Sequence, residues 1–163
     1  MKIAEDLTIL EILGIAVQTE HDQADFYRKF AAGVKNPMVT RKLESLASEE
    51  DSHARTLTEE YKRISSGEEL LLPQGFTTGI KKEIDPSMTP ERIIETAMGY
   101  EKAAQEFYQE AARRAEDPKG RQVLEYLSEF EADHYRFLET ELRQLRRNPD
   151  WFEQEHELMH VGP

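Results

Sequence analysis

The feature that most constrains the fold of this chain is an internal repeat with an offset of 81 residues. The segment AVQTEHDQADFYRKFA at 16–31 aligns with AMGYEKAAQEFYQEAA at 97–112, and the alignment continues without a gap to residues 57 and 138. It pairs glutamate with glutamate at 20 and 101, proline with proline at 37 and 118, and histidine with histidine at 53 and 134. Two copies are too few for a solenoid, so the repeat predicts two equivalent units related by a pseudo-twofold axis.

Each copy has the pattern of a helical hairpin. Amphipathic helices are expected over residues 5–33, 37–66, 89–116 and 117–147. Asn36-Pro37 and Asp117-Pro118 give the second helix of each hairpin a capping side chain followed by proline at the first helical position. Residues 67–88 contain glycines and prolines without lasting periodicity, so we expect them to return the chain along the bundle.

These elements predict an all-α four-helix bundle with a long crossover between the second and third helices, which then run parallel. We expect residues 1–147 to form the bundle and residues 148–163 to form a tail with a short helix. A chain of 163 residues is long enough to fold as one domain around its own core. It has no cysteine, which excludes disulfides and iron–sulfur clusters.

The charge of the chain limits its partners. A net charge of −12 argues against binding to nucleic acid, which requires a basic surface, and against binding to an anionic membrane surface. No apolar run approaches the roughly 20 residues that cross a bilayer, and the amino-terminal segment lacks the features of a secretory signal. We therefore expect a cytoplasmic protein.

The apolar stripe of each helix is interrupted by residues that can bind metal ions. Stripes drawn at alternating steps of three and four residues place six such side chains toward the core: Glu20, Glu50, His53, Glu101, Glu131 and His134. The glutamates of each hairpin lie 15 residues on either side of its turn, at residue 35 or 116. That spacing puts each of them about 22 Å from the turn, so all six can meet at the middle of the bundle.

Four buried carboxylates need compensation. Burial of a carboxylate without a compensating charge costs roughly several kcal/mol per ion. Two divalent cations would balance the combined charge of −4. Carboxylate and imidazole ligands suit iron or manganese, with zinc or cobalt as substitutes. A single Glu-x-x-His pattern is commonly a surface pair, as Glu153 and His156 illustrate. Two copies on core stripes, each 30 residues after a core glutamate, indicate a dinuclear metal site.

These six residues resemble the ligands of rubrerythrin-like diiron proteins, which belong to the ferritin-like superfamily. The resemblance covers residues 5–147 and implies an up-down-down-up bundle that holds two iron ions. By this pattern Glu50 and Glu131 would bridge the metals, Glu20 and Glu101 would be terminal ligands, and each histidine would bind one metal.

The chain departs from that pattern in two places. Rubrerythrins carry a four-cysteine rubredoxin module, so this chain would need an external electron donor, either rubredoxin-like or a flavoprotein. Ala104 stands where rubrerythrins tend to have an extra glutamate, which bears on the peroxidase function. The ligand set is also similar to that of bacterioferritin, but Asp51 stands where a haem-binding methionine would follow the second-helix ligand, so no haem is expected.

Several other residues are candidates for supporting roles. Tyr27 and Tyr108 lie seven residues after Glu20 and Glu101 on the same stripes, where they would either hydrogen-bond a ligand or fill the core. Gln23, Asp51 and Asp133 could orient an imidazole or be solvated. Trp151 and Phe152 suggest an apolar anchor for a homodimer. His156 and His160 would either bind a metal at the surface or lie in a disordered tail. Leu70–Leu72 are expected to pack on the outside of the bundle or at an interface.

Three functions follow from this reading. The first is a diiron oxidoreductase that reduces hydrogen peroxide or O₂ with electrons from the external donor. The second is a ferritin-like ferroxidase that handles or stores iron. The third is a metal-free structural or interaction bundle, which would require the inward glutamates to be protonated or hydrated.

Overall fold

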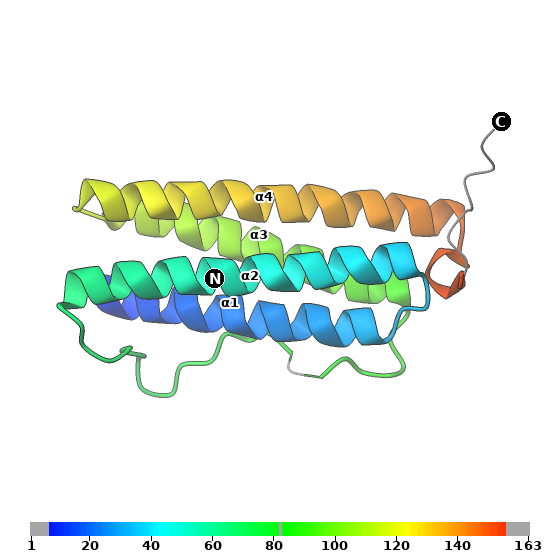
Figure 1. Ribbon diagram of the computed structural model, residues 1–163, viewed down its shortest axis with the longest axis horizontal. Helices are drawn as coiled ribbons and strands as arrows, with labels where there is room; N and C mark the ends of the chain where they lie inside the picture. Colours follow the sequence, from blue (N-terminus) through cyan, green and yellow to red (C-terminus); the bar gives the residue numbers. More distant parts are fainter. Residues whose placement is uncertain (1–6, 82, 156–163) are drawn as a thin grey trace.

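A computed structural model describes residues 7–81 and 83–155 and contains four long helices, drawn in Figure 1. They are α1 (Ile9–Ala32), α2 (Pro37–Ser65), α3 (Pro90–Arg114) and α4 (Pro118–Arg147), followed by the short 3₁₀ helix η1 (Trp151–Glu153). Helix α1 pairs with α2 and α3 pairs with α4, and the crossover brings the chain back so that α2 and α3 run in the same direction. The predicted all-α bundle with up-down-down-up order is therefore confirmed. Within the described ranges, no helix has both the length and the apolar character needed to span a membrane.

Capping side chains set the helix ends. The Asn36 side chain accepts hydrogen bonds from the backbone N–H groups of Met38 and Val39, and the Asp117 side chain accepts one from Gly120. Helix α1 begins at Ile9 and not near residue 5, because Thr8 and Glu11 form a reciprocal capping box. The T-x-x-E pattern of that box was present in the sequence and was missed.

The crossover is fixed to the bundle through its backbone. The Tyr61 hydroxyl donates to the carbonyl oxygen of Glu69 and accepts from the N–H of Leu71. A Cβ atom added to Gly14 would lie 2.0 Å from the carbonyl oxygen of Leu71, so only glycine fits at that position of α1. The side chains of Leu70, Leu71 and Leu72 remain 38–48% exposed on the outside of the bundle.

The segment after α4 closes one end of the bundle. The carbonyl of Phe152 accepts hydrogen bonds from the N–H groups of Lys35 and Asn36, and its ring packs against Phe30 at a centroid distance of 5.8 Å. Phe152 is only 2% exposed, and the Trp151 indole donates to Glu141. Phe152 is therefore packed on its own bundle and is not available as an anchor for a second subunit, whereas Trp151 is only half-buried and its part in that interpretation stays a prediction. The homodimer stays a prediction.

The apolar core is divided into two clusters. One contains residues such as Leu13, Leu57 and Leu127, and the other contains residues such as Leu43, Ile94 and Leu138. The six predicted ligand residues lie between these clusters along every helix. The fold thus places a polar layer in mid-bundle with apolar packing on either side.

Candidate metal centre

The bundle brings the six glutamate and histidine residues together in its core. Helices α1 and α3 each contribute one glutamate, and α2 and α4 each contribute a glutamate and a histidine three residues later. Such a spacing puts both side chains on one helix face. All four glutamates are 0% exposed, and His53 and His134 are 6% and 3% exposed. The convergence agrees with the stripes drawn from the sequence.

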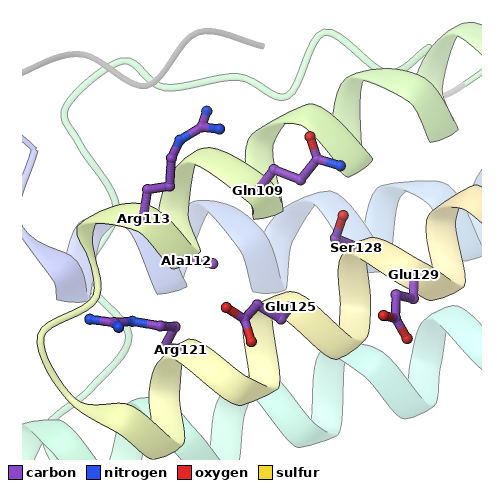
Figure 2. A pocket seen from close by; sticks show the side chains of 7 residues that line it. All are labelled: Gln109, Ala112, Arg113, Arg121, Glu125, Ser128 and Glu129. Atoms are coloured by element: carbon purple, nitrogen blue, oxygen red, sulfur yellow. The ribbon is translucent and has the colours of Figure 1, made fainter.

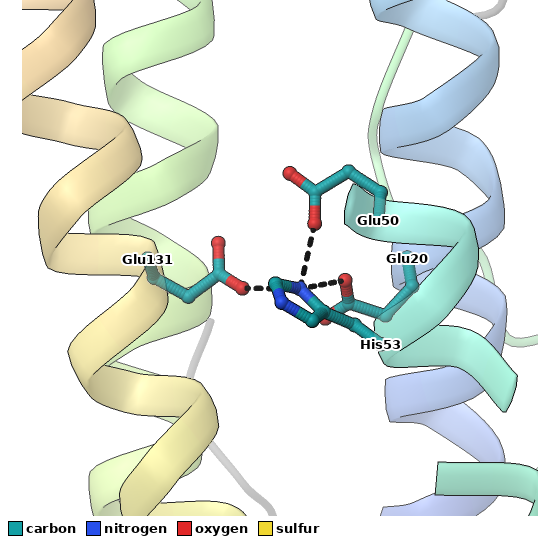
Figure 3. A group of neighbouring side chains, drawn as sticks. All are labelled: Glu20, Glu50, His53 and Glu131. Carbon is teal, nitrogen blue, oxygen red and sulfur yellow. Dashed lines mark hydrogen bonds and ion pairs between the residues drawn. The ribbon is translucent and has the colours of Figure 1, made fainter. Parts of the chain in front are cut away.

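The first of two groups surrounds His53, as Figure 3 shows. Its Nδ1 atom lies 3.0 Å from Glu50 Oε2, 3.3 Å from Glu20 Oε2 and 3.8 Å from Glu131 Oε1. One ligand atom from each of these four residues lies within 4.8 Å of the others. Three helices therefore supply oxygen and nitrogen atoms to one small volume.

The second group surrounds His134. Its Nδ1 atom lies 3.0 Å from Glu50 Oε1, 3.7 Å from Glu101 Oε2 and 4.0 Å from Glu131 Oε2. Glu50 and Glu131 belong to both groups, whereas each histidine and each of the other glutamates belongs to one. This sharing is what two adjacent cations bridged by two carboxylates require.

Several ligand atoms lack hydrogen bonds although they are fully buried. They are Glu20 Oε2, Glu50 Oε1, His134 Nδ1 and both oxygens of Glu131. Buried polar atoms are normally hydrogen-bonded, because losing water without replacement costs about 1–3 kcal/mol each. All of them belong to residues of the two groups of clustered ligand atoms, where a cation would satisfy them. The residues thus fit a dinuclear metal site with mixed carboxylate and imidazole ligands.

Without a metal, protons take up the charge. Burial and the negative charge of Glu50 raise the pKa of Glu20 to about 8, and burial with the neighbouring glutamates raises the pKa of Glu131 well above its usual range. Burial opposes ionisation of Glu50, but the nearby imidazoles of His134 and His53 outweigh it and lower its pKa to about 2. Burial of the two histidines would lower their pKa values, but the carboxylates around them have the larger effect. They raise the pKa of His53 to about 9 and that of His134 to about 11.

Comparison with known proteins decides the family. A family model for rubrerythrin matches residues 11–157 of the chain. The chain belongs to the rubrerythrin family. A hypothetical protein from Pyrococcus furiosus shares its fold with a TM-score of 0.78 and 25% identity, covering 87% of this chain and 92% of its own. A search of curated proteins gave no match.

Two more distant structures show the same fold. The bacterioferritin of Rhodobacter capsulatus, solved with a metal-free dinuclear site and haem iron, aligns with a TM-score of 0.72 and 20% identity over 99% of this chain and 100% of its own. A manganese catalase from Anabaena aligns with a TM-score of 0.66 and 18% identity over 100% of this chain and 83% of its own. The bundle of this rubrerythrin-family protein is thus common to ferritin-like proteins.

Each of the two tyrosines holds a candidate ligand of the opposite hairpin. The Tyr27 hydroxyl on α1 donates to Glu101 on α3, and the Tyr108 hydroxyl on α3 donates to Glu20 on α1. Burial first, and then the carboxylate charges, raise the pKa of both phenols well above the usual value, so they stay protonated as donors. Of the two predicted roles, the contacts favour holding a ligand carboxylate.

Other supporting residues differ from the sequence-based candidates. Gln23 donates to Glu101 at 3.3 Å, and within the described residues it forms no hydrogen bond with an imidazole. Asp51 pairs with Arg28 and Asp133 pairs with Arg136, so neither orients a histidine. The residue that does so is Glu49, whose Oε2 lies 3.1 Å from His134 Nε2. It escaped prediction because it lies outside the core stripe of α2 and reaches α4 across the helix edge.

A surface hollow lies apart from this centre. Figure 2 shows it between α3 and α4, lined by Gln109, Ala112, Arg113, Arg121, Glu125, Ser128 and Glu129. None of the six candidate ligands lines it. In the tail, Glu153 forms an ion pair with Lys35 at 2.9 Å, and His156 and His160 lie outside the described residues. The predicted surface metal site there stays untested.

Proposed function

We propose that this rubrerythrin-family protein is a diiron oxidoreductase that reduces hydrogen peroxide or O₂ with electrons from an external donor. The observation that supports it is the sharing of Glu50 and Glu131 between two buried groups of ligand atoms. Two metals held by shared carboxylates can each give one electron, which together with two protons convert one H₂O₂ into two waters. A metal-free bundle is disfavoured, because it would leave buried carboxylate oxygens without partners.

The side chains would have distinct tasks at this centre. Glu50 and Glu131 would bridge, Glu20 and Glu101 would each bind one metal, and His53 and His134 would each supply an imidazole. Tyr27 and Tyr108 fix the terminal carboxylates in place, which pre-orients them for the metals. The apolar clusters at either end of the layer limit access of bulk water along the bundle.

An external electron donor is part of the proposal, because the 163 residues contain no cysteine to hold an iron–sulfur centre. A rubredoxin-like protein or a flavoprotein is the proposed donor, and a cytoplasmic location and a homodimer belong to the same proposal. Iron is the proposed metal. Manganese is the alternative that the likeness to a manganese catalase supports, and zinc would be a redox-inert substitute.

The first experiment is an anaerobic titration of metal-free protein with Fe(II), followed by mixing with hydrogen peroxide. We expect two Fe(II) bound per chain, and two oxidised for each H₂O₂ consumed. Addition of reduced rubredoxin or reduced flavoprotein should then sustain turnover. Failure to bind iron in a folded, helical sample would overturn the proposal. Release of O₂ from peroxide without any donor would instead indicate a catalase reaction.

A ferroxidase that handles iron is the second candidate, supported by the likeness to a bacterioferritin over nearly the whole chain. It would use the same ligands but oxidise Fe(II) as substrate and pass Fe(III) on. Particle size and iron content after aerobic loading with excess Fe(II) separate the two. A cage that retains many irons per chain would favour storage, whereas a dimer with two retained irons would favour the oxidoreductase.

A further inference from the structure

The two halves of the centre differ where the repeat is broken. Residues four apart on α2, Ser45 and Glu49, correspond by the 81-residue offset to Tyr126 and Phe130 on α4. The first pair is polar and the second pair is aromatic. The second member of each pair contacts the histidine of the other hairpin, Glu49 beside His134 and Phe130 beside His53, so the break in the repeat occurs next to both imidazoles.

On one side a hydrogen-bond chain supports His134. The Ser45 hydroxyl donates to Glu49 Oε1 at 3.0 Å, and Glu49 Oε2 lies 3.1 Å from His134 Nε2. His134 Nδ1 meanwhile faces the ligand carboxylates. A carboxylate on the outer nitrogen fixes the ring orientation and places the proton there, which leaves the inner nitrogen free to bind a metal.

On the other side aromatic rings cover His53. Phe130 stands edge-on to its imidazole at a centroid distance of 5.2 Å, and Tyr126 packs on Phe130 at 4.6 Å. Within the part of the chain that the structure describes, every hydrogen bond and ion pair of His53 is made by Nδ1. No carboxylate there takes the place that Glu49 has beside His134.

The terminal glutamates differ in the same direction, because Glu101 accepts more side-chain hydrogen bonds than Glu20. Glu101, in the group of His134, accepts hydrogen bonds from both Tyr27 and Gln23. Glu20, in the group of His53, accepts one from Tyr108, and the residue that corresponds to Gln23 is Ala104. Glu101 and His134, which belong to one metal position only, are therefore each supported by an extra polar side chain. Glu20 and His53, which belong to the other position only, are not.

We propose that the two metal positions are inequivalent: a divalent cation occupies the Glu101/His134 position first and more tightly, and the Glu20/His53 position is the exchangeable one. Glu49 and Gln23 act as positioning residues for the tight site. Outer hydrogen-bond partners of metal ligands typically change affinity by about 10–100-fold, so we expect a ratio of that size between the two positions. The inference rests on the dinuclear site of the proposed function.

The test uses Co(II), which reports its coordination through visible absorption and can be located by anomalous X-ray scattering. Metal-free protein is crystallised with one equivalent of Co(II) per chain, and the anomalous density at the two positions is compared. We expect most of the cobalt beside His134. In solution, the absorption titration should show two steps separated by roughly 10–100-fold in affinity.

Three variants make the test specific. Glu49→Ala with Gln23→Ala should bring the density at the two positions close to equality. The exchange Glu49→Phe with Phe130→Glu should shift cobalt toward His53. Glu59→Gln removes one exposed charge of α2 and should leave the wild-type ratio unchanged.

The outcomes separate this inference from the proposed function. Equal cobalt at the two positions, whether from equal affinities or from paired loading, would overturn the inequivalence and leave the dinuclear site standing. Preference for the Glu20/His53 position, or a wild-type ratio in the Glu49/Gln23 double variant, would also overturn it. Absence of cobalt from both positions would overturn the dinuclear site itself.

Discussion

The Tyr27 hydroxyl donates a hydrogen bond to Glu101, so the first hairpin holds a candidate ligand of the second hairpin across the bundle. The repeat requires the reciprocal contact, and Tyr108 makes it to Glu20. A candidate terminal ligand of each proposed metal position is thus oriented by a residue that belongs to the other half of the chain. The site is therefore coupled to the docking of the two hairpins.

Replacement of either tyrosine by phenylalanine should weaken this coupling. Removal of a donor from a buried carboxylate costs about 1–3 kcal/mol of unfolding free energy. We expect Tyr108→Phe to cost more than Tyr27→Phe, because Glu101 keeps its hydrogen bond from Gln23. Chemical denaturation of the metal-free proteins measures this. The control is Tyr135→Phe, which removes a hydroxyl on a different helix, α4, and should change stability by less than about 0.5 kcal/mol. Equal stability of all three variants would contradict the argument.

Replacement of Glu131 by leucine should stabilise the metal-free protein while it weakens metal binding. Both oxygens of Glu131 are buried without hydrogen bonds, so an apolar side chain of similar size removes a penalty of about 1–3 kcal/mol. Glu20→Leu is the matched control, because it would leave the Tyr108 hydroxyl without its acceptor and should not stabilise. Thermal unfolding of the metal-free variants tests this. A destabilised Glu131→Leu would show that the carboxyl group has a structural partner.

The same pair of variants should differ in metal stoichiometry. Glu131 belongs to both groups of ligand atoms, whereas Glu20 belongs to one. We therefore expect Glu131→Leu to weaken binding at both positions, and Glu20→Leu to leave one Fe(II) bound per chain. Equilibrium dialysis with metal analysis measures this. Identical losses in the two variants would argue against the sharing of Glu131.

The sequence predicted the site better than its surroundings, for physical reasons. The six candidate ligands lie on core stripes of four helices, so helical periodicity places them on the inward faces. Asn36 and Asp117 set the starts of α2 and α4, and thus the turns from which the level of the glutamates was counted. Contacts such as Glu49 with His134 depend on how α2 and α4 are rotated against each other. The late start of α1 was missed although its capping box was visible. The role of Phe152 was misassigned because an apolar residue after the last helix can pack on its own bundle as well as on a partner.

Stability of the metal-free protein should fall as the pH rises from about 5 to 9. The folded-state pKa of Glu20, about 8, and that of His53, about 9, exceed their usual values. The folded state therefore binds more protons than the unfolded state, and the stability this provides is lost as the pH passes through each folded pKa. Glu50, with a pKa lowered to about 2, has the opposite effect, but only below pH 5.

Thermal unfolding at a series of pH values checks this expectation. The metal-loaded protein is the control, because its cations replace the protons and its unfolding temperature should depend less on pH in this range. The Glu20→Gln variant should show a shallower decline in the metal-free form. A metal-free protein whose stability is constant or rises between pH 5 and 9 would contradict the assignment of protons to the buried site.

Substitution of Gly14 by alanine should detach the crossover from α1. An added Cβ would lie 2.0 Å from the Leu71 carbonyl oxygen, which is backbone and is held by Tyr61 through the neighbouring N–H. We expect a loss of about 1–3 kcal/mol, as for other forced overpacking. Gly99→Ala is the matched control, since a Cβ there meets nothing within 4 Å and the helix of α3 should gain about 0.5–1 kcal/mol. Chemical denaturation of both variants, with proteolysis of the crossover as a second measurement, tests the contact. If Gly14→Ala matched the stability of the wild type and resisted proteolysis equally, the crossover would not be anchored at Leu71.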